Sequence, residues 1–133
     1  MEHQFVSKID IRFADIDMYG HVNNAVFFSY MEIARTDAML KGGFSFEESP
    51  VQLFIVEAEC KYKKPIKLDD ELYIDCYFRF NENVRFSIHY IFRDENHNIY
   101  ASGDTVLAVI SRETGKPVRV PQELKEIMMD MRE

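Results

Sequence analysis

Residues 12–35 read RFADIDMYGHVNNAVFFSYMEIAR, and the architecture of the whole chain can be worked out from this stretch. Its first half gathers two carboxylates, a glycine, a histidine and two asparagines between Asp15 and Asn24. Its second half is apolar at most positions, which predicts a helix that is buried on most sides. A polar loop that runs directly into such a helix brings its polar atoms to the helix N-terminus, where backbone N–H groups have no partners within the helix.

The helix is predicted from about Ala25 to Leu40, with Asn23 or Asn24 as its N-cap. The pair Gly42-Gly43 marks its end. The central stripe of the helix is apolar, and it consists of Phe27, Met31, Ala34 and Ala38. The polar strip is narrow, and it consists of Ser29, Glu32 and Thr36. We therefore expect this helix to be the central element around which the rest of the chain is wrapped.

Five segments predict β-strands, because apolar and polar residues alternate in them or β-forming residues run together. These segments are residues 5–13, 51–62, 72–80, 84–92 and 99–111. Asn81-Glu82-Asn83 is typical of a hairpin connection, and a short helix is predicted from Pro121 to about Met131. One long apolar helix followed by consecutive strands predicts an α+β fold, with an antiparallel sheet curled around the helix.

The composition restricts the class of protein. The 133 residues have the length of one domain, residues 1–133, and the formal net charge of −7 argues against general nucleic-acid binding. The N-terminus lacks the pattern of a signal peptide, and no apolar stretch approaches the roughly 18 residues that cross a bilayer. Two cysteines, Cys60 and Cys76, are too few for a disulfide framework. We expect a cytoplasmic protein with no membrane span.

The pattern Asp15-x-Asp17-x-x-Gly20-His-Val-Asn-Asn, continued by Glu32-x-Ala-Arg35, resembles the hotdog-fold thioesterases of the 4-hydroxybenzoyl-CoA thioesterase-like family. The segments Tyr-Lys-Lys-Pro at 62–65 and Ala-Ser-Gly at 101–103 resemble the same family, so the likeness spans nearly the whole chain. It implies a hotdog fold, in which a curved antiparallel sheet of about five strands wraps a long central helix. It also implies a homodimer or homotetramer with its active sites between protomers.

The reaction that this resemblance implies is hydrolysis of an acyl thioester of coenzyme A, or of acyl carrier protein, without a cofactor or a metal. Coenzyme A is then part of the substrate. Such hydrolysis needs a carboxylate that attacks the carbonyl or activates water, and donors that hold the oxyanion. A second interpretation, from another class, is a module that binds a thioester or a partner without catalysis. An aromatic acyl group and an acyl group of fatty acid metabolism both remain open.

Asp17 matches the catalytic carboxylate of the family, which implies a general base or a nucleophile. A carboxylate that merely supports a turn or caps the helix is the alternative. The candidate oxyanion donors are the backbone amides of Asn23, Asn24 and Ala25 at the helix N-terminus. Gly20 allows the backbone to turn tightly next to a substrate.

His21 corresponds to a histidine that plant acyl-carrier-protein thioesterases are proposed to use in catalysis. Those enzymes have asparagine where this chain has Tyr19, so His21 either takes part in catalysis or orders the loop. Asn24 stands where another branch of the family has a histidine. It cannot act as a base at neutral pH, but it can cap the helix or bind a catalytic water. Tyr19, Phe27, Phe28 and Tyr30 are either lining residues of an acyl tunnel or core residues.

Several other polar residues of the pattern have simpler interpretations. Asp15 is expected to support the loop, and Glu32 and Arg35 to form an ion pair three residues apart on the helix. Glu57 and Glu59 share one face of the second strand, and either could reach the active site of a partner protomer. Cys60, without a nucleophile signature, is expected to be a core residue.

The densest basic group in this acidic chain consists of Lys61, Lys63, Lys64 and Lys67. It suits the phosphates of coenzyme A, or an acidic carrier protein, although a solvated strand end is an equal alternative. Arg85 is a second candidate for contact with the substrate.

Overall fold

The computed structural model describes residues 4–80 and 82–130. Five strands and two helices are present in the expected order, and their bounds are β1 Gln4–Ile9, α1 Val26–Lys41, β2 Val51–Tyr62, β3 Leu72–Arg79, β4 Arg85–Arg93, β5 Ile99–Ser111 and α2 Gln122–Asp130. Among the described residues, no helix is long and apolar enough to cross a membrane.

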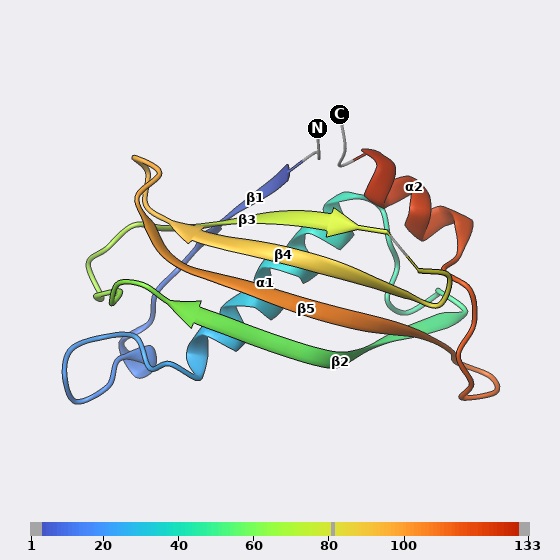
Figure 1. The fold of residues 1–133 in the computed structure, drawn as a ribbon, viewed down its shortest axis with the longest axis horizontal. Coiled ribbons are helices and arrows are strands. Elements are labelled where there is room, and N and C mark those ends of the chain that lie inside the picture. The colour runs from blue at the N-terminus through green and yellow to red at the C-terminus, as the bar shows by residue number, and fades with distance from the viewer. Residues whose placement is uncertain (1–3, 81, 131–133) are drawn as a thin grey trace.

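The strands form one antiparallel sheet in the order β1-β3-β4-β5-β2, so β1 and β2 lie at opposite edges. Helix α1 lies along one face of this sheet, and the sheet curves around it (Figure 1). The α+β architecture with a central helix is therefore confirmed. The short helix α2 lies at the end of the molecule where α1 finishes (Figure 1).

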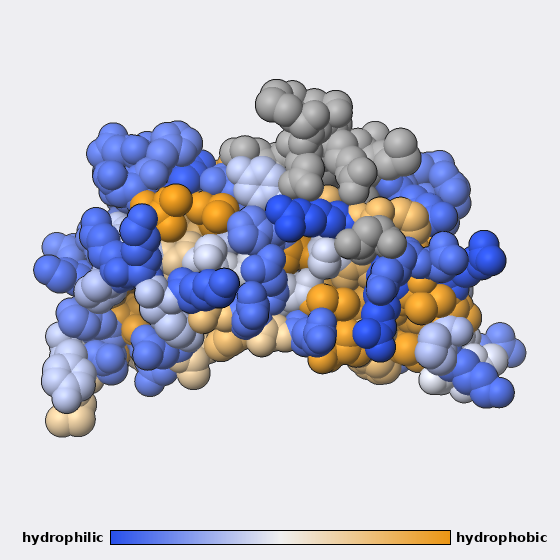
Figure 2. All heavy atoms as spheres, in the orientation of Figure 1, coloured by the Kyte–Doolittle hydropathy of each residue, from blue (hydrophilic) through white to orange (hydrophobic). Residues whose placement is uncertain are grey.

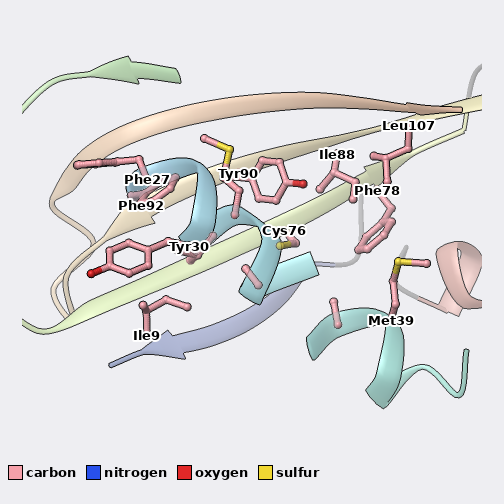
Figure 3. Packing of buried hydrophobic residues seen from close by; sticks show 14 of the residues in the cluster. Ile9, Phe27, Tyr30, Met39, Cys76, Phe78, Ile88, Tyr90, Phe92 and Leu107 are labelled. Carbon is pink, nitrogen blue, oxygen red and sulfur yellow. The ribbon is translucent and has the colours of Figure 1, made fainter. Parts of the chain in front are cut away.

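The core lies between α1 and the concave face of the sheet (Figure 3). Every second residue of the central strands points into it, as the periodicity predicted, and each such buried aromatic or aliphatic side chain stabilises the fold by roughly 1.5–3 kcal/mol. The β3 and β4 members are Leu72, Ile74, Cys76, Phe78, Phe86, Ile88, Tyr90 and Phe92. Ala34 and Ala38 let the helix approach closely, and at Gly103 in β5 an added Cβ would collide with the end of the Met31 side chain.

Strand β2 contains a β-bulge that reverses the orientation of its side chains. Leu53 and Ile55 pair with buried residues of β5 and therefore face α1. The register shifts between Ile55 and Glu57, and beyond the shift it is Ala58, Cys60 and Tyr62 that pair with inward-facing positions. In the first half of β2 the odd-numbered residues face α1. In the second half, beyond the bulge, the even-numbered residues face it.

One expected bound was wrong, and two other predictions cannot be checked in full. The strand expected over residues 5–13 ends at Ile9, because Phe13–Asp15 forms a 3-10 turn that leaves the Phe13 side chain 83% exposed. Asn81 in the expected hairpin and Met131 at the end of the expected C-terminal helix lie outside the described residues.

The helix is also less enclosed than its sequence predicted. Phe28 is exposed on the side of α1 that faces the edge strand β2, where it lines a hollow with Ile55 and Ala58, whereas Ile33 and Leu40 are exposed elsewhere on the helix. Strand β2 itself has exposed apolar side chains at Phe54 and Val56, and Figure 2 shows apolar atoms gathered over its first half. Because the sheet ends at β2, no further strand of the described chain covers the side of the helix that carries Phe28.

Candidate active site

The loop that precedes α1 is a narrow hairpin built on backbone hydrogen bonds. Ile16 and Val22 form an isolated antiparallel bridge, and the Asp17 N–H donates to the His21 carbonyl at 2.7 Å. Gly20 closes the turn with a φ of 81°, and its N–H donates to the Asp17 carbonyl at 3.1 Å. A positive φ is readily adopted by glycine, so this part of the expectation for Gly20 holds.

The two oxygens of the Asp17 carboxylate have different surroundings. Oδ1 accepts hydrogen bonds from the backbone N–H groups of Tyr19 at 2.8 Å and His21 at 3.1 Å. Oδ2 has no hydrogen-bond partner within residues 4–80 and 82–130, and the half-buried side chain lines a pocket. One oxygen therefore holds the turn, as the structural alternative proposed, while the other is available for chemistry.

The pocket has a volume of about 320 Å³ and lies between the loop, the start of α1 and the end of β2. Figure 1 shows the loop beside the end of β2. The lining residues are Asp17, His21, Val22, Asn24, Phe27, Tyr62, Lys63, Lys64 and Pro65. Among the described residues, no group of three or more His, Cys, Asp or Glu side chains is arranged to hold a metal ion.

The start of α1 uses some of its backbone N–H groups internally and leaves others free. The helix N-cap is Ala25, without a side-chain cap bond, so the expectation of Asn23 or Asn24 as the N-cap was wrong. The side chain of Asn23 accepts from the Ala25 N–H at 2.9 Å and so holds the turn that leads into the helix. The Asn23 N–H donates to the Asp15 carbonyl at 2.8 Å. The amides of Asn23 and Ala25, both expected as oxyanion donors, are therefore occupied. The Asn24 N–H has no partner in the described part of the chain, and Asn24 lines the pocket.

Tyr62 and Phe27 form the inner wall of the pocket. Their rings meet edge to face, with centroids 4.9 Å apart and an interplanar angle of 83°. The Tyr62 hydroxyl donates to the Asn24 carbonyl at 2.7 Å. Sequence reasoning assigned no role to Tyr62; its place beside Lys63 and Lys64 in the Tyr-Lys-Lys-Pro segment was the available signal.

His21 lines the same pocket as Asp17, so the structure brings these two expected residues together. The His21 backbone forms an isolated bridge with Lys67, which fixes the loop to the segment after β2. Its imidazole has no hydrogen-bond partner among the described residues and is half-buried. The backbone of His21 therefore orders the loop, while its side chain lines the pocket.

The lysines of the basic group divide into two sets. Lys63 and Lys64 line the pocket, and their N–H groups both donate to the Tyr100 carbonyl, at 2.9 and 3.0 Å. The Lys64 ammonium lies over the Tyr100 ring, 5.2 Å from its centroid. Lys61 points away from the helix side of β2, and Lys67 contributes only backbone bonds near the loop; neither lines the pocket.

Other expected substrate contacts lie away from the pocket. Tyr19 is 85% exposed at the tip of the loop, and neither Tyr19 nor Gly20 lines the cavity. Arg85 pairs with Ala108 in β5, whereas the pocket lies near Ala101, at the other end of that strand. At about 3.3 Å per residue the two ends are roughly 20 Å apart, so Arg85 does not belong to the pocket of its own chain.

Glu57 and Glu59 are exposed on the outer face of the sheet, where Glu59 pairs with Asp104. They do not reach the pocket of their own chain. Cys60 is half-buried against the core, and burial raises the pKa of its thiol, which agrees with a core residue rather than a nucleophile. The expected helical ion pair is present: Arg35 Nη2 lies 3.6 Å from Glu32 Oε2.

Asp15 supports the loop from below. Its buried carboxylate accepts from the Arg12 guanidinium at 2.8 Å and from the Tyr30 hydroxyl at 2.7 Å. Burial alone would raise the pKa of Asp15, but the hydrogen bonds from Arg12 and Tyr30 outweigh it and hold the pKa below its ordinary value. Tyr30 is thus a core residue that binds Asp15, and it does not line the pocket.

The chain belongs to the thioesterase-like superfamily, whose family model matches residues 11–128. The uncharacterized protein YsmA of Bacillus subtilis is 27% identical over 128 residues, which cover 96% of this chain and 87% of that protein. The structure also resembles Slr0204, a 1,4-dihydroxy-2-naphthoyl-CoA thioesterase from Synechocystis, with a TM-score of 0.88, 20% identity and 96% coverage of both chains.

A third similar structure is the protein SAV2348 of Staphylococcus aureus, which was solved in complex with CoA. Its TM-score is 0.88 at 15% identity, and the match covers 98% of this chain and 85% of that chain. At these identities the neighbours establish the fold, which is the hotdog fold expected from the sequence. The family and its fold support thioester hydrolysis as the reaction class.

The lowered pKa of Asp15 predicts a pH-dependent contribution to stability. Since the folded-state pKa lies below the unfolded-state value of about 3.9, the contribution is present above that value and is lost as the pH falls through the folded-state pKa. Asp15→Asn should lower the free energy of unfolding by about 1–3 kcal/mol at pH 7, and by less at pH 3. Urea denaturation at both pH values measures this. Asp69→Asn, at an exposed site, is the control; an equal loss from Asp15→Asn at both pH values would contradict the prediction.

Proposed function

We propose that the protein is an acyl-CoA thioesterase that hydrolyses its substrate to a free acid and CoA. The observation that carries this proposal is that an unpartnered carboxylate oxygen of Asp17 and the unpartnered N–H of Asn24 belong to residues lining one pocket. A base or nucleophile and an oxyanion donor are the two groups that thioester hydrolysis requires. The comparison with a CoA-bound neighbour of the same fold supports CoA as the thiol.

Asp17 acts in one of two ways. As a general base, it takes a proton from a water molecule whose oxygen attacks the thioester carbon. As a nucleophile, it attacks that carbon itself and forms a mixed anhydride, which water then hydrolyses. In both cases the carbon–sulfur bond breaks, and the CoA thiolate leaves and takes up a proton. Incorporation of ¹⁸O from labelled water into Asp17 during a single turnover would identify the anhydride route.

Asn24 contributes its backbone N–H to the oxygen that becomes negative in the tetrahedral intermediate. The positive end of the α1 dipole favours negative charge at the same place. His21, which lines the pocket, passes a proton to the leaving thiolate in this proposal. The Asn24 side chain, which has no partner among the described residues, binds the attacking water.

Lys63 and Lys64 at the pocket provide positive charge for the phosphates of CoA. Acyl carrier protein remains the alternative donor, because the same lysines would attract an acidic protein. The acyl group is either aromatic, like that named for Slr0204, or aliphatic as in fatty acid metabolism.

The expected homodimer also belongs to this proposal. The long edge strand β2 has exposed apolar side chains, and such an edge is usually covered in natural proteins. We propose that a second copy pairs with β2 and covers the exposed side of α1, so that the pocket is completed by residues of the partner. Two dimers then either associate into a tetramer or remain separate.

The first test of the function replaces Asp17. Asp17→Asn keeps an oxygen that can accept from the N–H groups of Tyr19 and His21, so the loop should retain its shape. Because the amide can neither take a proton nor attack, kcat should fall by roughly 100-fold or more on any acyl-CoA that the wild type hydrolyses. A panel of aromatic and aliphatic acyl-CoA and acyl-carrier-protein substrates measures this.

The control for that experiment is Asp10→Asn, an exposed carboxylate at the end of β1 that should leave kcat unchanged. Full activity in Asp17→Asn would refute the assigned role of Asp17. If the wild type hydrolysed no member of the panel, the proposed function would be wrong, and a binding module without catalysis would take its place.

A second test concerns the two pocket lysines. The double variant Lys63→Gln/Lys64→Gln should lower kcat/KM for an acyl-CoA by roughly 3- to 10-fold at low salt, since each exposed charge contact contributes below about 1 kcal/mol. The same acyl group on N-acetylcysteamine, which carries no phosphate, should be hydrolysed equally by both proteins. Lys116→Gln, in the turn after β5, is the control. Equal losses on both substrates would show that the lysines do not bind the phosphates.

A third test concerns the edge of the sheet. Val56→Lys places a charge on exposed β2, and edge lysines oppose strand pairing. Sedimentation velocity should show a dimer or tetramer for the wild type and a shift toward the monomer for the variant. Ile99→Lys, an exposed apolar site at the start of β5, should keep the wild-type mass. A monomeric wild type would contradict this part of the proposal.

A further inference from the structure

The Asn24 carbonyl lies just before α1, whose N-cap is Ala25. The N-cap carbonyl is the first to accept a bond within a helix, so the helix offers the Asn24 carbonyl no partner. The Phe28 N–H accordingly donates to the Ala25 carbonyl, at 3.2 Å. The Asn24 carbonyl accepts instead from the Tyr62 hydroxyl at 2.7 Å. A side chain from the sheet therefore holds the residue that precedes the N-cap.

This bond belongs to a set that holds both peptide groups on either side of Asn24. The peptide group between Asn24 and Ala25 is fixed at its carbonyl by Tyr62 and at its N–H by the Asn23 side chain. The preceding peptide group is fixed at the Asn23 carbonyl, which accepts from the Val26 N–H at 2.9 Å. Because both peptide groups are held, the Asn24 N–H has a fixed direction. It has no hydrogen-bond partner among the described residues.

We infer that Tyr62 is a positioning residue that orients the Asn24 N–H as an oxyanion donor through its hydrogen bond to the Asn24 carbonyl. This inference rests on the proposed thioesterase function. A donor that is already oriented stabilises the transition state without rearrangement during the reaction. If the bond is lost, the peptide group between Asn24 and Ala25 can turn, and Asn24 is then held only from the Asn23 side, so the direction of its N–H becomes less well fixed.

The surroundings of Tyr62 suit this role. Its ring is held against Phe27, so the position of the hydroxyl does not depend on the hydrogen bond alone. Burial, together with the neighbouring Cys60 thiol, raises the pKa of Tyr62, so the phenol keeps its proton and remains a donor. Tyr62→Phe therefore removes one hydroxyl and leaves the ring contact in place.

The experiment compares the wild type, Tyr62→Phe and Tyr73→Phe on an acyl-CoA that the wild type hydrolyses. Tyr73 is the matched control, because its ring lies by Arg93 on the outer face of the sheet. For Tyr62→Phe, kcat should fall by roughly 10- to 100-fold while KM changes less than about twofold. Asn23→Ala, which releases the other end of the same peptide group, should show the same pattern.

Two inhibitors distinguish orientation of the donor from general support of the pocket. A CoA thioether has no carbonyl oxygen, whereas a trifluoromethyl ketone analogue of acyl-CoA forms a tetrahedral adduct that resembles the transition state. Tyr62→Phe should weaken the ketone by about the same factor as kcat and leave the thioether unchanged. Thermal unfolding of each variant provides the check on folding.

Each outcome has a definite meaning. An unchanged kcat in Tyr62→Phe, or equal weakening of both inhibitors, would overturn the role of Tyr62 while the thioesterase function stood. A wild type without activity on any thioester would remove the proposed function and this inference together. Loss of kcat and of ketone affinity, with thioether affinity and KM retained, would support the inference.

Discussion

The buried carboxylate of Asp15 is the contact on which the site depends. It binds the Arg12 guanidinium, in the segment that follows β1, and the Tyr30 hydroxyl, in the second turn of α1. The carbonyl of the same residue accepts the Asn23 N–H where the helix begins. Asp15 thus connects three segments: the chain before the loop, the helix, and the turn at Asn23 that leads into the helix. Because a buried charge without these partners is very unfavourable, the loop has little freedom to adopt another shape.

Much of the fold followed from local patterns. Alternation in β3 and β4 identified the buried face, and the glycines after Lys41 marked the end of α1. The candidate site was predictable where its residues are close in sequence. Asp17 and His21 belong to one short hairpin, and both line the same pocket. The Glu32–Arg35 pair is local in the same sense, since residues three apart on a helix are neighbours.

What sequence reasoning missed depends on contacts between distant segments. Nothing near Asn24 indicates that Tyr62, 38 residues later, binds its carbonyl. Which of the amides before the helix is free depends likewise on the Asp15 carbonyl, which binds the Asn23 N–H, and on the Asn23 side chain, which binds the Ala25 N–H. The exposure of Ile33 was also unforeseen, because an apolar residue on a helix predicts burial without saying whether the covering surface belongs to the same chain.

The β-bulge in β2 has a consequence for how this strand can vary. The strand consists of two half-strands in opposite phase, one that packs against the far part of the helix and one that carries Tyr62 to the pocket. Deleting the extra residue of the bulge would restore regular alternation along β2. The Tyr62 ring would then face the outer surface of the sheet, although no residue of the pocket had changed. The length of the strand near Val56 is therefore as much a determinant of the site as the identity of its residues.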